Sequence, residues 1–172
     1  MLHIAILSLA IATVDTVPPA RRELTPHAKP APAVEYSDAY YTRLTIHRIG
    51  SYAMLPLFAG EYYLGDKLLN GSDNAEWIKP VHVGVAMGIG GLFTANTVTG
   101  LWNLWDARHD PNGRTLRILH TSLMLAADAG FALTPLFADD DDSGKLSAHK
   151  NVALASMSVA TLGTAIMWFR RD

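Results

Sequence analysis

The chain has 172 residues, of which 49% are hydrophobic and 17% charged, and its formal net charge is −2. The near-neutral charge offers no basic surface for nucleic acid, and the hydrophobic share favours a membrane protein. The absence of cysteine excludes disulfides, iron–sulfur clusters, zinc–thiolate sites and thioether-attached haem. A chain of this length predicts one main domain.

Two segments precede that domain. Residues 1–17 (MLHIAILSLAIATVDTV) are an apolar run that is short for a membrane-spanning helix and lacks the basic start of a signal peptide. A cleaved signal and a retained anchor are therefore both open interpretations. Residues 18–42 are rich in Pro and Ala and predict an extended linker, which leaves residues 43–172 as the main domain.

Four hydrophobic segments make up the main domain. Residues 80–105 contain no charged side chain, and about 20 apolar residues are enough to cross the hydrocarbon core of a bilayer. We expect helices over about residues 44–64, 77–105, 114–138 and 147–169, the first with a kink at Pro56. Short polar loops with turn signals at residues 70–71 and 110–113 join them. The sequence predicts an all-α membrane protein, an antiparallel up-and-down four-helix transmembrane bundle.

Each predicted helix carries one histidine near its start. Because successive helices run in opposite directions, His47 and His120 should share one layer of the bundle, and His82 and His149 the opposite layer. Two neutral imidazoles, one on each face of the ring, satisfy haem iron, whereas zinc requires more ligands than the sequence offers here. The pattern predicts two bis-histidine metal centres, each clamped between non-adjacent helices.

Cations and glycines accompany these histidines. A basic residue lies within three positions of each one, and these cations could pair with haem propionates: Arg48, Lys79, Arg117 and Lys150. Gly50 and Gly84 follow closely after His47 and His82 and would leave room for the edge of a ring. Both features have simpler interpretations, because cations commonly anchor helix ends at the interface and small residues permit close helix packing. The remaining histidines, His3, His27 and His109, are expected to face solvent.

Residues 43–169, with four helices and the four histidines so paired, resemble the cytochrome b561 family of transmembrane electron carriers. The resemblance implies two b-type haems per chain and electron transfer from a reductant on one side to an acceptor on the other. The protein would be an electron carrier or a transmembrane oxidoreductase, with quinol or another redox protein as candidate partners. Two other functions remain open: a non-redox membrane subunit that scaffolds a larger complex, and a small metal-ion transporter.

Charge asymmetry suggests an orientation. One side of the predicted bundle holds seven arginines: Arg43, Arg48, Arg108, Arg114, Arg117, Arg170 and Arg171. The opposite side holds lysines and most of the loop acids. The positive-inside rule places the arginine side, with His47 and His120, in the cytoplasm of a plasma (inner) membrane protein. The lipid bilayer is then an expected partner, and an oligomer or larger complex stays open.

Two acids fall within the predicted spans, where ionisable groups are expensive and often functional. Asp128 is expected to be protonated or paired with Asn96, Thr97 or Thr99. It could serve as a proton partner or quinone contact, or only fix the helix register by a hydrogen bond. Glu61 lies near the outer boundary and is expected to reach water.

Overall fold

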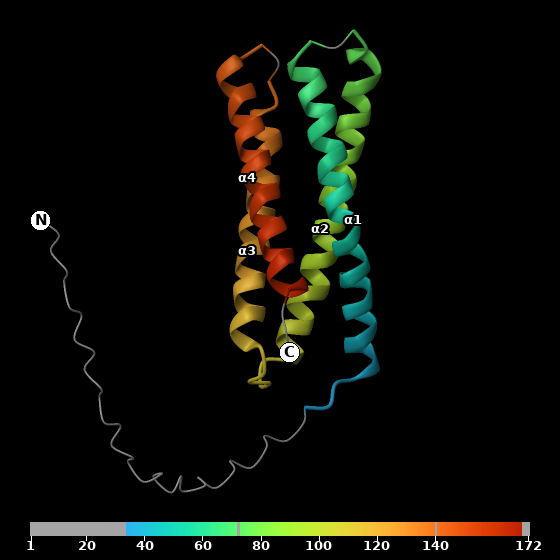
Figure 1. Ribbon diagram of the computed structural model, residues 1–172, viewed down its shortest axis with the longest axis vertical. Coiled ribbons are helices and arrows are strands. Elements are labelled where there is room, and N and C mark those ends of the chain that lie inside the picture. The colour runs from blue at the N-terminus through green and yellow to red at the C-terminus, as the bar shows by residue number, and fades with distance from the viewer. Residues whose placement is uncertain (1–33, 72, 140, 170–172) are drawn as a thin grey trace, which may run out of the picture. The chain divides into compact units, whose positions relative to one another are not determined.

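The computed structural model describes residues 34–71, 73–139 and 141–169, which form four long helices (Figure 1). These are α1 (Asp38–Leu69), α2 (Ala75–Asp106), α3 (Arg114–Leu133) and α4 (Ser143–Trp168), and a 3-10 turn, η1 (Thr134–Phe137), continues α3. No strand occurs in this part of the chain. The prediction of an all-α protein is therefore confirmed. The expected signal or anchor at residues 1–17, and the linker as far as residue 33, lie outside the described residues.

Helix α1 begins earlier than the sequence predicted. The Ser37 hydroxyl accepts a hydrogen bond from the Tyr40 N–H at 3.3 Å and so caps the helix, and Asp38 places a carboxylate in the first turn. Both features stabilise a helix start, because free N–H groups and the positive end of the helix dipole lie there. Residues 38–42 consequently belong to the helix rather than to the linker. Pro56 lies inside α1.

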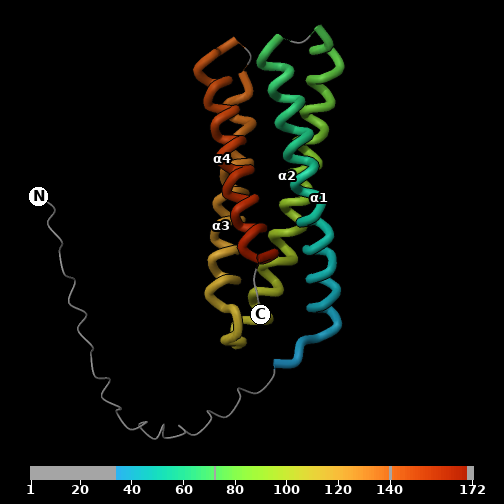
Figure 2. The backbone as a smooth tube through the Cα atoms, in the orientation of Figure 1, coloured from blue at the N-terminus to red at the C-terminus, as the bar shows by residue number. Residues whose placement is uncertain are grey.

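The four helices form two hairpins (Figure 2). α1 packs along α2 and α3 packs along α4, whereas contacts between the two hairpins are sparse. Within the described residues, the backbones of the diagonal pairs α1 with α3 and α2 with α4 do not come into contact. Gly71 and Gly113 occupy the turns before α2 and α3 with φ of 70° and 66°, a conformation that glycine adopts without steric cost.

An apolar core joins the hairpins midway along their length. It consists of Met54, Phe58, Ile89, Phe93, Ala127 and Ala160, with Phe131 packed against them. The three phenylalanine rings lie with centroids 4.8 to 6.1 Å apart, in the range of favourable aromatic pairs. Since α1, α2, α3 and α4 all contribute side chains, this cluster fixes the two hairpins against each other.

Three helical segments are long and apolar enough to cross a membrane: α2, the segment Arg114–Phe137 and α4. Many large apolar side chains point outward, among them the interfacial tryptophans Trp77, Trp102 and Trp105, each more than half exposed. A surface of this kind suits lipid better than water. The chain is therefore a multi-pass membrane protein by length and composition, and membrane crossing by α1 stays a prediction.

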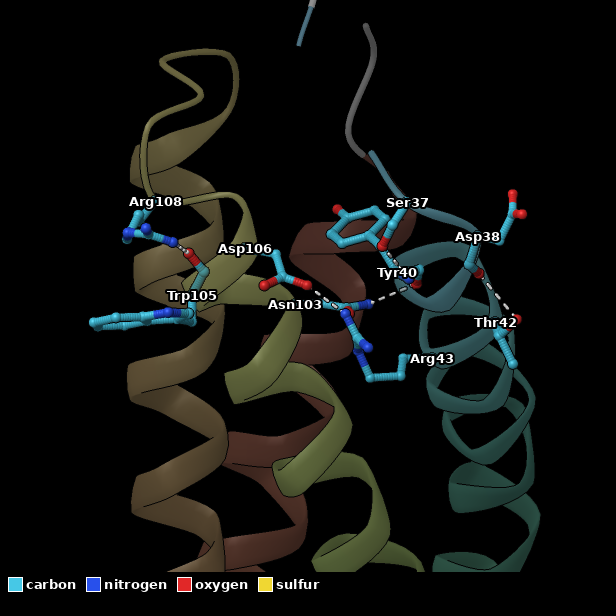
Figure 3. Close-up of polar contacts among 9 residues, drawn as sticks. All are labelled: Ser37, Asp38, Tyr40, Thr42, Arg43, Asn103, Trp105, Asp106 and Arg108. Atoms are coloured by element: carbon cyan, nitrogen blue, oxygen red, sulfur yellow. Dashed lines mark hydrogen bonds and ion pairs between the residues drawn. The ribbon is translucent and has the colours of Figure 1, made fainter. Parts of the chain in front are cut away.

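A network of hydrogen bonds and an ion pair connects the start of α1 to the end of α2 (Figure 3). Arg43 donates from Nε to Asn103 Oδ1 at 2.8 Å and pairs with the Asp106 carboxylate. The Asn103 amide in turn donates to the Tyr40 carbonyl at 3.3 Å. The Arg43 guanidinium also lies over the Trp102 ring, 4.9 Å from its centre. These contacts hold the end of the first hairpin that carries His47.

A second polar cluster lies outside the helices at the same end. The Tyr36 hydroxyl donates to Asp110 Oδ2 at 2.6 Å, and the Asn112 N–H donates to Asp110 Oδ1 at 2.9 Å. Burial, followed by the Asp110 hydrogen bond, raises the pKa of Tyr36 to about 12. The Tyr36 hydrogen bond, followed by that from Asn112, lowers the pKa of Asp110 below its usual 3.8. The cluster ties the segment before α1 to the α2–α3 loop.

These two shifts predict stability losses at both ends of the pH scale. The lowered pKa of Asp110 stabilises the folded state above pH 3.8, and this stabilisation is lost as the pH falls through the folded-state pKa. The raised pKa of Tyr36 stabilises the folded state below pH 10, and this stabilisation is lost as the pH rises from 10 to about 12. We expect Tyr36→Phe to lower the melting temperature by a few degrees at neutral pH. The melting temperature of the variant should also fall less steeply with pH at both the acid and the alkaline end. Circular dichroism melts of the detergent-solubilised full chain measure this. Tyr62→Phe, at an exposed ring, is the control, and a pH profile identical in both variants would contradict the assignment.

Candidate functional site

The structure brings the four helix histidines together as two pairs on diagonal helices. The rings of His47 on α1 and His120 on α3 have centroids 6.0 Å apart and planes inclined by 77°. The rings of His82 on α2 and His149 on α4 have centroids 6.2 Å apart and planes inclined by 62°. Each pair therefore bridges two helices whose backbones do not touch, at opposite ends of the phenylalanine cluster.

Hydrogen bonds fix the ring orientation of three of these histidines. Nδ1 of His47 lies 3.0 Å from the Asn96 carbonyl, Nδ1 of His120 lies 2.8 Å from the Gly163 carbonyl, and Nδ1 of His149 lies 3.0 Å from the Thr134 carbonyl. A carbonyl oxygen only accepts hydrogen bonds, so each of these rings carries a proton on Nδ1. The lone pair of Nε2 is then available to a metal.

The fourth histidine has a different partner. His82 Nδ1 lies 3.0 Å from Oε1 of Glu61 on α1, close enough for an ion pair although the ring N–H is not aligned for a hydrogen bond. Glu61 is 7% exposed, so the expectation that it reaches water is wrong. The reason is the rotation of α1, which turns this side chain toward α2 rather than toward the loop.

One offset generates all four contacts. The residue 14 positions after each histidine lies beside the histidine of the neighbouring helix in the same hairpin, at the opposite layer. In three cases that residue lies in the same helix as the first histidine, and in the fourth, Thr134, it lies in the 3-10 turn η1 that continues α3. Fourteen residues are close to four helical turns, so both positions lie on the same helix face, roughly 21 Å apart along the axis. The pairs of positions are His47 and Glu61, His82 and Asn96, His120 and Thr134, and His149 and Gly163. Every helix thus contributes one imidazole to its own layer and one acceptor to the opposite layer.

The spacing of the imidazole pairs is wide enough for one metal ion between two ring nitrogens. A metal–nitrogen bond of about 2 Å on each side, plus about 1 Å from each Nε2 to its ring centre, places the ring centres roughly 6 Å apart. No described residue makes a hydrogen bond to any of the four Nε2 atoms. The part of the chain that the structure describes contains no group of three or more His, Asp or Glu side chains that could hold a metal ion. Each pair of imidazoles therefore supplies two candidate nitrogen ligands and no third protein ligand among the described residues.

A cavity of about 700 Å³ adjoins the His47 and His120 pair. Its lining comes from all four helices and includes both histidines, Arg48 and Arg117, with apolar walls from residues such as Leu104 and Met124. Cofactor pockets commonly have volumes of 300 to 1,000 Å³ and combine apolar walls with a few polar groups. The cavity is therefore large enough for a flat ring between the two imidazoles.

The four predicted cations lie at the two ends of the bundle. Arg48, Lys79 and Lys150 are exposed. Arg117 is mostly buried and donates to the carbonyls of Ala107, Asn112 and Asp110, but its Nε is buried without a hydrogen-bond partner among the described residues. An unpaired buried N–H is costly unless an acceptor reaches it. Because Arg117 lines the cavity, its Nε is the best placed of these donors for a carboxylate of a bound group.

The glycines that touch the imidazoles are not those that the sequence suggested. A side chain at Gly50 would collide with the Asn96 amide, and one at Gly84 would meet nothing within 4 Å in the described chain. Instead, a Cβ on Gly100 would lie 3.1 Å from His47 Cε1, and one on Gly65 would lie 3.4 Å from His82 Cε1. The 14-residue offset from His47 could have identified Glu61 from the sequence. Gly65 and Gly100 could be identified only from the way the helices pack.

Asp128 accepts a hydrogen bond from the Thr97 hydroxyl, which links α3 to α2. Thr97 is one of the three partners that the sequence offered, so that pairing is confirmed. Asn96 instead packs on Gly50, and Thr99 lies 3.3 Å from His47 Nδ1. The exposed loop residue His109 stays outside both pairs, as expected.

No family model, curated protein or solved structure matches this chain.

Proposed function

We propose that this protein is a multi-pass dihaem b-type cytochrome that carries electrons across a membrane. One observation carries the proposal: two imidazole pairs bridge diagonal helices, with ring centres 6.0 and 6.2 Å apart, at opposite ends of one bundle. In this proposal α1 is a fourth span, and α1 to α4 alternate in direction across the bilayer. The resemblance to the cytochrome b561 family, which rests on the same four histidines, supports the proposal.

The chain's own residues would hold and orient each haem. The imidazoles of each pair would ligate the iron, and the carbonyl acceptors at Nδ1 of His47, His120 and His149 would make these ligands more basic and fix their ring planes. When bound, each haem supplies a one-electron iron couple, and the protein supplies ligation, orientation and electrostatics. Each pair takes one ligand from each hairpin, so ligation would also join two hairpins that otherwise contact each other sparsely.

Cations at the two bundle ends support the binding of propionates. At the His47 and His120 layer, Arg48 and Arg117 line the cavity, and the unpaired Arg117 Nε provides a buried donor. Lys79 and Lys150 stand near His82 and His149 at the opposite layer. Charge-assisted hydrogen bonds of this kind are about twice as strong as neutral ones.

The separation of the layers fits a relay across a membrane. The layers lie roughly 21 Å apart along a helix, which is most of the ~30 Å hydrocarbon core. The apolar cluster of Met54, Phe58, Phe93 and their neighbours lies between the layers. By the positive-inside rule the His47 and His120 layer would face the cytoplasm. Quinol or a partner redox protein would then exchange electrons at each end.

An absorption spectrum tests the proposal directly. The detergent-purified full chain is measured oxidised and dithionite-reduced, and haem is quantified per chain by the pyridine method. We expect a reduced b-type spectrum with about two haems per chain, because each layer offers both axial ligands. One haem per chain would assign a structural role to one pair. A colourless protein after expression with ample haem would overturn the proposal and favour a scaffolding subunit.

A further inference from the structure

Glu61 breaks the regularity of the histidine contacts. At three of the four positions the atom facing Nδ1 is a main-chain carbonyl oxygen, from Asn96, Gly163 or Thr134. At the fourth position a carboxylate takes its place, with Glu61 Oε1 lying 3.0 Å from His82 Nδ1. The two imidazole layers are therefore chemically different, although their ring spacings are nearly equal.

The surroundings of Glu61 make this difference large. Its side chain is 8% exposed and that of His82 is 18% exposed, so little water screens the charge. The second carboxylate oxygen, Oε2, is buried without a hydrogen-bond partner in the described part of the chain. At this low exposure a charge on Glu61 would act on the His82 ring with little screening by water. The nearby Gly65 leaves room for the His82 ring beside it.

We propose that Glu61 is a positioning residue that lowers the reduction potential of the haem held by His82 and His149 below that of the other haem. The inference rests on the proposed function. The Glu61 carboxylate lies 3.0 Å from His82 Nδ1, whereas the other three imidazoles face neutral main-chain carbonyls, so only this layer has an acidic side chain against a ligand ring. A negative charge on Glu61 at this distance would favour the oxidised iron. Electrons would therefore move downhill from the His82 and His149 layer to the His47 and His120 layer.

The test is a potentiometric titration of the purified holoprotein and its Glu61→Gln variant. Glutamine keeps the shape and an acceptor oxygen but removes the charge. We expect two haems in both proteins, and in the variant one midpoint higher by the equivalent of about a tenfold change in the reduced-to-oxidised ratio, or roughly 59 mV for a one-electron couple. The EPR g values of one oxidised low-spin centre should change with it, and those of the other should not.

Single-haem backgrounds assign the shift to a layer. In the His120→Ala background the remaining haem is that of His82 and His149, and Glu61→Gln should move its midpoint. In the His149→Ala background the same change should leave the midpoint in place. Asp128→Asn is the matched control, since it removes another carboxyl within the bundle, one that accepts a hydrogen bond from Thr97 and pairs with no histidine among the described residues. If Glu61→Gln does not accumulate, Glu61→Asp keeps the charge but withdraws it from Nδ1, and should raise the same midpoint by less.

The outcomes separate this inference from the proposed function. Two haems with unchanged midpoints in Glu61→Gln, or a shift in the other layer, would overturn the role of Glu61 and leave the cytochrome intact. An equal shift in Asp128→Asn would also overturn it, because the effect would then be general electrostatics. A wild-type protein without haem would remove the proposed function itself.

Discussion

Replacement of His120 by alanine is expected to reduce the haem content from about two to about one per chain, because haem iron at this layer would lose one of its two axial ligands. The loss should be confined to the layer of His47, whose ring centre lies 6.0 Å from that of His120. The His82 and His149 pair lies beyond the phenylalanine cluster and shares no hydrogen bond with His120. Haem quantification by the pyridine method, with the potentiometric midpoint of the remaining haem, measures the result.

His109→Ala is the matched control for this experiment. It removes a histidine from the same region of the chain, but His109 is exposed in the α2–α3 loop and belongs to neither pair. The variant should keep both haems. His47→Ala should reproduce the spectrum of His120→Ala, because each removes one ligand of the same centre. Retention of both haems in His120→Ala would refute the diagonal pairing.

Substitution of Gly100 by valine is expected to have the second largest effect. A Cβ at this position would lie 3.1 Å from His47 Cε1 and 3.4 Å from Nδ1, and the further methyl groups of valine extend beyond it. Overpacking of this kind costs about 1–3 kcal/mol, which corresponds to a loss of affinity of about fivefold to about 150-fold if the ring is displaced from its ligating position. We expect haem to be lost selectively from the His47 and His120 layer. Haem titration of the apoprotein, followed by absorbance, measures the affinity.

Gly88→Val separates the steric effect from the general effect of valine in a helix. Gly88 lies in the same helix, α2, and a Cβ there would meet nothing within 4 Å. This variant should bind both haems as the wild type does. Equal affinity losses in the two variants would indicate that helix distortion, and not contact with His47, is responsible.

The hydrophobic pattern was sufficient to predict the helices. Uninterrupted apolar runs and short polar loops placed the centres of α2, α3 and α4, and three of the four segments are long and apolar enough to span a membrane. The start of α1 was missed, since the cap formed by Ser37 and Tyr40 lies in a region whose composition indicated a linker. A cap depends on one hydrogen bond, which an average over composition does not detect.

The sequence by itself determined which residues share a layer. Helix length fixes the height of each histidine along the bundle, so alternating direction alone pairs His47 with His120 and His82 with His149. Only the tertiary structure decided what each imidazole touches, because that depends on the rotation of each helix about its axis and on how neighbours pack. It buried Glu61 against His82, where the sequence suggested contact with water, and it placed Gly65 and Gly100 beside the rings. The position of a histidine along the bundle follows from counting residues along one helix. The contacts of its side chain depend on the packing free energy of all four helices.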